Sequence, residues 1–305
     1  MVVDDEDELQ LRWGVQRRLE FIDFRLFWDG RFNRKDLALA FGISNQQASA
    51  DVAQYEALAP GHLTYDPALK AYVRADGFRP RFIGRQIDRF LLQLLAVESG
   101  WLGQEYTWFD VLPPVEVVSL RTRPTNPEHL LAVLDAIRGR QELTLDYRSM
   151  TGSTQPGRSI APHALVHSKG RWYARSWSRD HNDFRDFNLN RIQAVSSSRP
   201  CSVDAALDFE WAHKINLVLT PNPRLGPARQ QAVALEYEMT EGVLKIPTRL
   251  SLSFYLMSEH NLDVADDVLA PEKQQLVLRN RIEVDQARAA ARQMSKEALA
   301  RADAF

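Results

Sequence analysis

Apolar positions recur at helical spacing in the first part of the chain. The segment 9–28 predicts an amphipathic helix because its apolar residues follow a period close to 3.6, at Leu11, Val15, Leu19, Ile22 and Leu26. Asp29-Gly30 ends this pattern. Shorter helices are predicted at 34–41 and 45–58, and strand-like runs at 62–65 and 71–74 predict a hairpin. The N-terminal part is therefore expected to be a small helical domain with a hairpin.

The pattern after residue 78 predicts an α+β chain of several domains. Apolar residues from 79 to about 100 lie on one side of a helix, and the run 106–120, which contains Pro113-Pro114, predicts an extended connector. Thr125-Asn126 predicts the start of a helix at 127–139, with Glu128 in its first turn. Alternating residues predict strands over 141–200, and the chain from about 209 is of mixed type, with a tail helix at 284–305.

The segment around residues 34–58 has the features of a helix-turn-helix. A turn at Gly42 separates the two helices, and Ser44 is a natural N-cap because its hydroxyl can accept a hydrogen bond from a free N–H group. The polar residues that follow would face the major groove, while basic residues of the first helix and of the hairpin, or wing, would contact phosphates. The predicted DNA-binding residues are Arg34, Lys35, Ser44, Asn45, Gln46, Gln47, Ser49, Lys70 and Arg74.

Composition limits the class of protein. The chain has 305 residues, 45% of them hydrophobic, and its acidic start, MVVDDEDELQ, is unlike a signal peptide. No apolar stretch is long enough to span a membrane, and the single cysteine excludes an internal disulfide framework, so we expect a cytoplasmic protein. Residues 121–200 contain thirteen Lys and Arg against seven Asp and Glu, although the net charge of the chain is only −2. This basic middle suggests an anionic ligand or a nucleic acid.

Two strings in the basic middle, GRWYARSW at 170–177 and FRDFNLNRI at 184–192, predict adjacent strands. Arg171, Tyr173 and Arg175 would share one face of the first strand, and Arg185 and Phe187 one face of the second. Together the two strands could form a surface of arginines with aromatic side chains between them, which suits phosphates and stacked bases.

These strings resemble the WYL-domain transcriptional regulators. Trp172-Tyr173-Ala174 lies where that family has Trp-Tyr-Leu, and the family's Arg-x-Phe followed by Arg-Ile is matched by Arg185, Phe187, Arg191 and Ile192. Arg158 and Pro162 match an upstream arginine and proline. The order of the parts is similar to the BrxR/CapW type of regulator, found beside bacterial anti-phage defence operons.

The resemblance implies four parts and a function. These are a winged helix-turn-helix at 1–78, a helical linker at 79–120, a WYL domain with an Sm-like β-barrel at 121–205, and an α/β C-terminal dimerisation domain at 206–305. It implies a homodimeric repressor that binds a double-stranded DNA operator and whose WYL domain senses a nucleic-acid or nucleotide effector, which lowers operator affinity. The implied ligand surface comprises Tyr147, Ser149, Arg158, His163, Tyr173, Arg185 and Arg191. Trp172 and Phe187 are expected in the core.

Other functions stay open at this point. A metal enzyme would need His163 and His167 on one helix face with a third ligand, but Pro162 and the strand-like flanks argue against a helix, so neither an enzyme nor a bound cofactor or metal is expected. A single-stranded RNA- or DNA-binding protein is the main alternative, since aromatic and arginine-rich strands can stack bases. An activator of the same architecture is the other.

Overall fold

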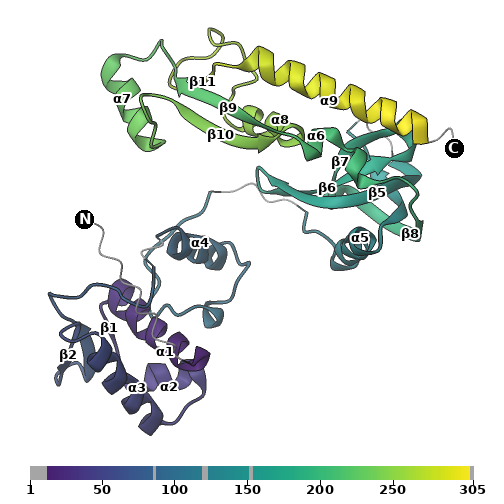
Figure 1. The fold of residues 1–305 in the computed structure, drawn as a ribbon. Helices are drawn as coiled ribbons and strands as arrows, with labels where there is room; N and C mark the ends of the chain where they lie inside the picture. Colours follow the sequence, from purple (N-terminus) through teal and green to yellow (C-terminus); the bar gives the residue numbers. More distant parts are fainter. Residues whose placement is uncertain (1–11, 85–86, 119–122, 151–153, 303–305) are drawn as a thin grey trace. The chain divides into compact units, whose positions relative to one another are not determined.

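The computed structural model of the 305-residue chain describes residues 12–84, 87–118, 123–150 and 154–302. The chain forms two compact units, residues 1–120 and 121–305, both built from helices and strands (Figure 1). The predicted α+β class is therefore confirmed. None of the helices within the described ranges is long and apolar enough to cross a membrane.

The N-terminal unit contains a small three-stranded sheet with the order β1-β3-β2, packed with helices. The helices predicted at 34–41 and 45–58 and the hairpin are confirmed. The elements, in chain order, are α1 (Trp13–Phe24), the π-helix η1 (Arg25–Asp29), β1 (Arg31–Phe32), α2 (Arg34–Phe41), α3 (Asn45–Leu58), β2 (Leu63–Asp66), β3 (Ala71–Arg74), α4 (Ile87–Glu98) and the 3-10 helix η2 (Gln104–Tyr106).

Local signals determine where α2 and α3 begin and end. Asn33 and Asp36 form a reciprocal capping box at the start of α2, and Gly42 ends that helix with a φ of 63°, a left-handed conformation that favours glycine. The Ser44 hydroxyl accepts a hydrogen bond from Gln47 N (3.1 Å), as predicted for an N-cap. Leu37 and Val52 then meet in the shared core of the two helices.

The helix predicted from residue 79 begins only at Ile87 among the described residues, so that prediction is wrong for 79–84. The buried carboxylate of Asp23 explains the difference. It accepts hydrogen bonds from the backbone N–H groups of Arg81 (2.6 Å), Phe82 (2.5 Å) and Ile83 (3.2 Å), and also from the Tyr55 hydroxyl. These bonds tie residues 81–83 to α1 and to the recognition helix α3, in place of helical hydrogen bonds.

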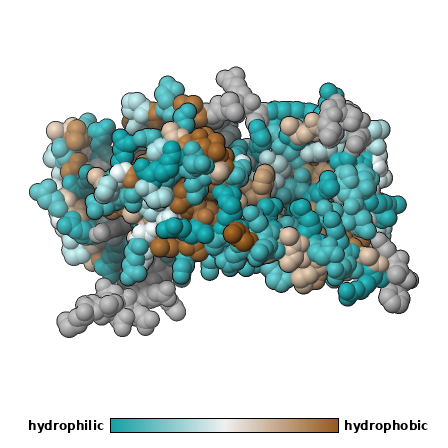
Figure 2. All heavy atoms as spheres, turned by 90° about the horizontal axis from the view of Figure 1, so that it is seen from above, coloured by the Kyte–Doolittle hydropathy of each residue, from teal (hydrophilic) through white to brown (hydrophobic). Residues whose placement is uncertain are grey.

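Aromatic residues between 87 and 110 pack against the winged-helix core. Phe90 of α4 stacks on Trp28 with ring centroids 4.0 Å apart, and Trp108 and Phe109 contact Phe24 at 5.7 and 5.6 Å. Other large apolar side chains stay exposed, on α4 at Ile87, Leu91 and Leu92. Figure 2 shows a face of the molecule that is mainly hydrophilic and interrupted by hydrophobic patches.

A five-stranded antiparallel sheet forms the centre of the second unit, with the order β7-β6-β5-β4-β8. Its helix α5, predicted at the same bounds, covers β4, β5 and β8. Strands β7 and β8 form its two edges and do not pair with each other over the described residues, so the Sm-like barrel stays a prediction. The elements are α5 (Pro127–Gly139), β4 (Gln141–Arg148), β5 (Thr154–Ser168), β6 (Arg171–Ser178), η3 (Arg179–His181), β7 (Asp183–Asn188), η4 (Leu189–Arg191) and β8 (Ile192–Pro200).

The C-terminal part adds a three-stranded sheet, β10-β9-β11, and the long helix α9, which packs on α6 and α8 (Figure 1). Its own core includes Leu217, Leu219 and Val284, which are fully buried. This confirms the predicted mixed structure from about residue 209. The elements are η5 (Ala205–Leu207), α6 (Phe209–Ala212), β9 (Lys214–Pro221), α7 (Pro227–Glu236), β10 (Leu244–Arg249), α8 (Leu250–Glu259), β11 (Leu276–Leu278) and α9 (Arg281–Ala302).

The buried carboxylate of Glu142 gives the second unit a pH-dependent stability. Burial alone would raise its pKa, but hydrogen bonds from Arg179 (2.7 and 2.8 Å), Arg199 (3.1 Å) and Ser159 lower it to about 2, from 4.5. A carboxylate whose folded pKa is depressed stabilises the fold above its unfolded pKa. Its contribution is therefore present above pH 4.5 and is lost as the pH falls towards 2.

We predict that Glu142→Gln destabilises the second unit at pH 7 and that this difference shrinks as the pH falls from about 4.5 towards 2. Urea unfolding at a series of pH values, followed by circular dichroism, measures it. Glu259→Gln, at an exposed carboxylate at the end of α8, is the matched control and should change little at any pH. A Glu142→Gln effect that is independent of pH would contradict this assignment.

Candidate nucleic-acid interface and arginine cluster

The first turn of α3 presents exposed polar side chains. Asn45 and Gln46 are exposed, and within the described part of the chain their side-chain amides form no hydrogen bonds. Side-chain amides at the start of a recognition helix can read base edges in the major groove. These two predicted residues are therefore free for contact with DNA.

Of the other predicted residues at the two helices, Arg34, Ser44, Gln47 and Ser49 have partners in the protein. Gln47 donates to the buried carboxylate of Asp51 (3.0 Å), which also accepts from Arg18, and Ser44 is occupied as the N-cap. Arg34 donates to Ser49 (3.1 Å), and this bond joins the start of α2 to α3. Lys35 is exposed in the first turn of α2. The side chains of Gln47 and Ser49 thus help to orient the helix.

The two basic residues of the wing occupy different ends of it. Lys70 is exposed in the turn of the hairpin. Within this turn, the carboxylate of Asp66 accepts hydrogen bonds from the backbone N–H groups of Ala68 and Leu69. Arg74 lies at the base of β3, and its guanidinium donates to the carbonyl of Phe27 (2.8 Å). Lys70 is thus free to reach a phosphate, whereas Arg74 braces the wing against the π-helix.

Four of the predicted ligand residues come together on one face of the five-stranded sheet. Arg158 lies over the ring of Tyr147 at 5.7 Å, and burial raises the pKa of the Tyr147 hydroxyl while Arg191 is close enough to lower it. His181, which follows β6, lies close enough to Arg185 and Arg158 for burial and then the charges of these two arginines to lower its pKa. We call these residues, Tyr147, Arg158, His181, Arg185 and Arg191, the arginine cluster.

The arginine cluster carries an excess of positive charge. Asp180 pairs with Arg158 (3.2 Å) and Asp183 lies 3.9 Å from Arg185, but Arg191 has no carboxylate partner within the described ranges. Desolvation, together with the charges of Arg185 and Arg158, lowers the pKa of His181, so the imidazole is neutral at pH 7. An anionic ligand would offset this accumulation of cations.

The strand register corrects the predicted arginine surface. Ser176 pairs with Arg185 and Arg175 pairs with Asp186, so Arg185 and Arg175 point to opposite faces of the sheet. Arg175 is buried and bonds to Asp208 (2.7 and 2.9 Å) on the face towards the C-terminal part. The arginines of β6 and β7 therefore do not form one surface, and the cluster combines Arg185 of β7 with residues of β4, β5, η3 and η4.

His163 and Tyr173 lie away from the arginine cluster. His163 Nε2 is 3.0 Å from Asp208, and the ring of Tyr173 lies 5.2 Å from that of Tyr255 in α8. Ser149 is half-buried just beyond the end of β4. The structure therefore does not bring the predicted ligand residues His163 and Tyr173 to the arginine cluster.

The tryptophan of the family motif is exposed. Trp172 has 49% of its surface accessible and packs on His167 (4.8 Å), so its expected place in the core is wrong, whereas Phe187 is buried as expected. His167 and His163 lie on a strand and have different partners. No group of three or more potential metal ligands occurs in the described segments.

The comparisons with known proteins cover most of the chain. Three family descriptions match: the BrxR transcriptional regulator winged helix-turn-helix domain at residues 14–96, the WYL domain at 128–197 and the BrxR transcriptional regulator C-terminal dimerization domain at 214–284. The DNA-binding transcriptional repressor CapW of Pseudomonas aeruginosa is 35% identical over 280 residues, 90% of this chain and 91% of that protein. The chain belongs to the BrxR/CapW family of WYL-domain transcriptional regulators.

Other relatives agree with this membership. CapW of Stenotrophomonas maltophilia, also described as a DNA-binding transcriptional repressor, is 34% identical over 91% of this chain and 93% of its own length. A solved structure, proteasome accessory factor B/C of Arthrobacter aurescens, matches with 16% identity and a TM-score of 0.23 over 92% of this chain and 48% of that one.

In this BrxR/CapW family member, sequence reasoning missed two groups of residues. His181 joins the arginine cluster, and Asp180 pairs with its Arg158, only because η3 folds back beside β5, and no local motif marks these two residues. Arg31 lies exposed on β1, a strand of two residues that pairs with β3 beside the wing. The Asp29-Gly30 turn just before Arg31 in the sequence is compatible with a third strand at this position but does not require one.

Proposed function

We propose that this protein is a homodimeric transcriptional repressor that binds duplex DNA through α3 and the wing. The observation that carries the proposal is the exposed, unbonded pair of amides, Asn45 and Gln46, at the start of the second helix of a helix-turn-helix. Relatives similar over nine-tenths of the chain are described as DNA-binding transcriptional repressors, which supports the same function here.

Dimerisation fits this proposal. Residues 214–284 match a domain described as a dimerization domain. Helix-turn-helix proteins gain affinity when two copies match two half-sites about one helical turn apart, roughly 34–36 Å. The operator is therefore proposed to be a pair of inverted half-sites.

We predict that Asn45→Ala combined with Gln46→Ala lowers the affinity for operator DNA at least about tenfold, since a good amide–base contact contributes about 1–3 kcal/mol of discrimination. Fluorescence anisotropy with labelled DNA from upstream of the protein's own gene, at one fixed salt concentration, measures it. Gln16→Ala, at an exposed amide of α1 in the same unit, is the control and should leave the affinity unchanged. Equal affinity of the double variant and wild type would remove α3 from the interface.

The arginine cluster is proposed as the effector site, with a nucleic acid or nucleotide as the ligand. The guanidinium groups of Arg185, which is exposed, and Arg191, which is half-buried, provide partners for phosphates, and the buried Arg158 and Tyr147 support them from below. On β7, Arg185 faces the cluster while its neighbour Asp186 accepts a hydrogen bond from Tyr255 of α8 (3.0 Å). Occupation of the cluster can therefore act on the C-terminal part through one strand.

Release of the operator is proposed to follow from a change in the segment between the two units. Residues 81–83 and 108–109 are held against the winged-helix core, so among the described residues of the predicted linker we propose 111–118 as the part that changes. The effector must bind the released state more tightly than the DNA-bound state by several kcal/mol to shift occupancy decisively, about 5.5 kcal/mol for a shift from 99:1 to 1:99.

We predict that short single-stranded DNA releases the protein from its operator and that Arg185→Ala/Arg191→Ala abolishes this release without weakening duplex binding. A gel-shift titration of the upstream duplex, with and without single strands, tests it. Arg138→Ala/Arg171→Ala removes the same charge from two exposed arginines outside the cluster and is the control. Duplex binding indifferent to single strands would exclude this effector, and single-strand or RNA binding without specific duplex binding would favour the RNA-binding alternative.

The controlled genes are proposed to belong to an anti-phage defence operon. Support for this comes only from the resemblance to the BrxR/CapW type. Transcript levels of the neighbouring genes should rise when the protein is deleted and when cells are infected with phage. Lower transcript levels on deletion would instead identify an activator.

A further inference from the structure

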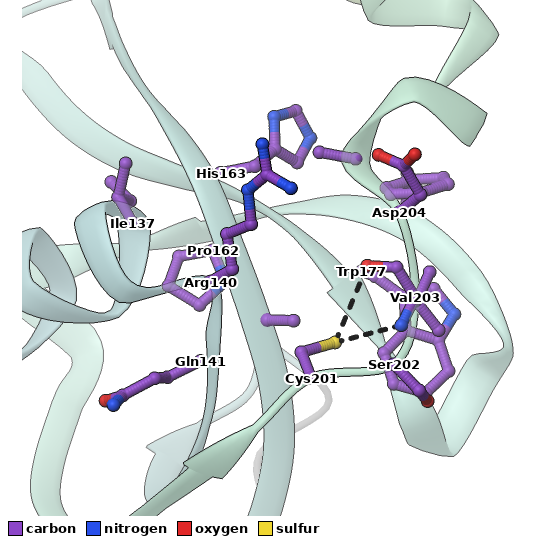
Figure 3. A pocket seen from close by; sticks show the side chains of 13 residues that line it. Ile137, Arg140, Gln141, Pro162, His163, Trp177, Cys201, Ser202, Val203 and Asp204 are labelled. Atoms are coloured by element: carbon purple, nitrogen blue, oxygen red, sulfur yellow. Dashed lines mark hydrogen bonds between the residues drawn. The ribbon is translucent and has the colours of Figure 1, made fainter.

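A cavity of about 370 Å³ in the second unit shares no residue with the arginine cluster (Figure 3). It lies between the end of α5, strands β5 and β6, and the segment 201–205 that connects β8 to η5. Its volume falls within the roughly 300–1,000 Å³ of small-molecule sites. Among its lining residues, Pro162, Trp177, Phe184 and Val203 supply apolar surface.

Two side chains of opposite charge border this cavity. Arg140 follows α5 in a left-handed conformation, with a φ of 50°, and its side chain extends towards His163 (Figure 3). Asp204 caps η5 by accepting from Ala206 N (2.9 Å) through one carboxylate oxygen. Neither Arg140 nor Asp204 has an ion-pair partner among the residues that the structure describes. The cavity thus offers the N–H donors of the Arg140 guanidinium and the acceptor oxygens of the Asp204 carboxylate, and these two groups do not form an ion pair with each other.

We propose that this cavity binds a purine nucleoside, or a planar heterocycle with the same edges. A purine such as guanine has acceptors on one edge, O6 and N7, and a donor amino group on another, so it can face Arg140 and Asp204 at the same time. The apolar side chains provide the wall beside the ring. A larger nucleic acid does not fit a cavity of about 370 Å³. This site is independent of the effector proposed for the arginine cluster.

The position of the cavity indicates what such a ligand would influence. Segment 201–205 leads directly to Asp208, whose carboxylate binds both His163 and Arg175. Trp177 and Phe184, which line the cavity, also pack against Leu299 near the end of α9. A bound nucleoside therefore contacts the junction between the WYL sheet and the C-terminal part.

Cys201 provides a direct report of occupancy. It is the only cysteine of the chain, it lines the cavity, and its thiol lies 3.4 Å from Val203 N (Figure 3). Partial burial raises the pKa of this thiol, so labelling by a disulfide reagent is slow enough to follow by mixing. A ligand in the cavity must slow that labelling.

The test is the rate at which 5,5′-dithiobis(2-nitrobenzoate) labels Cys201 in the full-length protein with guanosine, adenosine or uridine present. We expect guanosine or adenosine to protect the thiol and uridine not to. Saturation-transfer NMR on the nucleoside protons gives a second measurement of binding that does not depend on the thiol.

Two variants remove the charges without disturbing the local fold. Arg140→Asn keeps a residue that tolerates the left-handed conformation, and Asp204→Asn keeps an N-cap. Each should raise the nucleoside concentration needed for protection at least about tenfold, since hydrogen bonds to charged groups are strong. The control is Arg138→Gln, because Arg138 lies in α5 just before Arg140 but is paired with Asp135. In this variant the nucleosides should protect the Cys201 thiol at the same concentrations as in wild type. No protection by either purine, equal protection by uridine, or full protection in both charge variants would overturn the proposal.

Discussion

Replacement of Asp23 by alanine is expected to destabilise the N-terminal unit by about 3–5 kcal/mol, because it leaves several buried donors without an acceptor. The Asp23 carboxylate is fully buried and accepts from the Tyr55 hydroxyl and from three backbone N–H groups of residues 81–83. Burial and the neighbouring Asp23 charge raise the pKa of Tyr55, so this hydroxyl keeps its proton as a donor. DNA binding should fall with stability, since Tyr55 belongs to α3.

Urea unfolding measures this loss, and hydrogen exchange locates it. Amide protection at residues 81–83 and in α3 should fall together in Asp23→Ala. Asp76→Ala, at an exposed carboxylate of the same unit, is the control and should change the free energy of unfolding by no more than about 0.5 kcal/mol. If protection at 81–83 is unchanged in Asp23→Ala, the carboxylate does not hold that segment.

Arg175→Ala is expected to destabilise the second unit by about 3–5 kcal/mol, because it leaves buried carboxylates without their cation. Burial opposes the charge on Arg175, but Asp208, Asp186 and Glu210 raise its pKa above the usual value, so it stays charged. The guanidinium connects β6 to α6. It donates two hydrogen bonds to Asp208, the residue before α6, and it forms an ion pair with Glu210 of α6 at 3.5 Å. The WYL sheet and the C-terminal part should therefore loosen together.

The control for Arg175→Ala is Arg171→Ala on the same strand, where the side chain is exposed and its loss should cost little. Thermal unfolding compares the two variants, and hydrogen exchange at β6, β7 and α6 identifies the affected elements. Equal stability of the two variants would show that the buried ion pairs contribute no more than surface charges do.

Helices marked by local capping signals could be predicted from the sequence with their bounds. Ser44 and Asn126 each cap a helix by accepting hydrogen bonds from backbone N–H groups two or three positions away, so the information is contained in the segment itself. For the same reason the exposed amides Asn45 and Gln46 of the candidate DNA interface could be identified. Family resemblance supplied Arg158, Arg185 and Arg191.

Features that depend on distant residues could not be predicted. The period of apolar residues favours a helix from 79, but Asp23, more than fifty positions earlier, binds the backbone of 81–83 and prevents it. The pairing of Ser176 with Arg185 depends on the register between β6 and β7, and one residue of slip would reverse the face of every side chain. The interpretation of one continuous arginine surface failed for that reason.

DNase footprinting of the region upstream of the protein's own gene tests whether the protein binds a paired operator. We predict a protected stretch with two inverted half-sites about one helical turn, roughly 10 base pairs, apart. That protection should disappear in the Asn45→Ala/Gln46→Ala variant and persist in Gln16→Ala. Absence of any protected stretch with folded wild-type protein, at concentrations where it binds single-stranded DNA or RNA, would contradict this prediction.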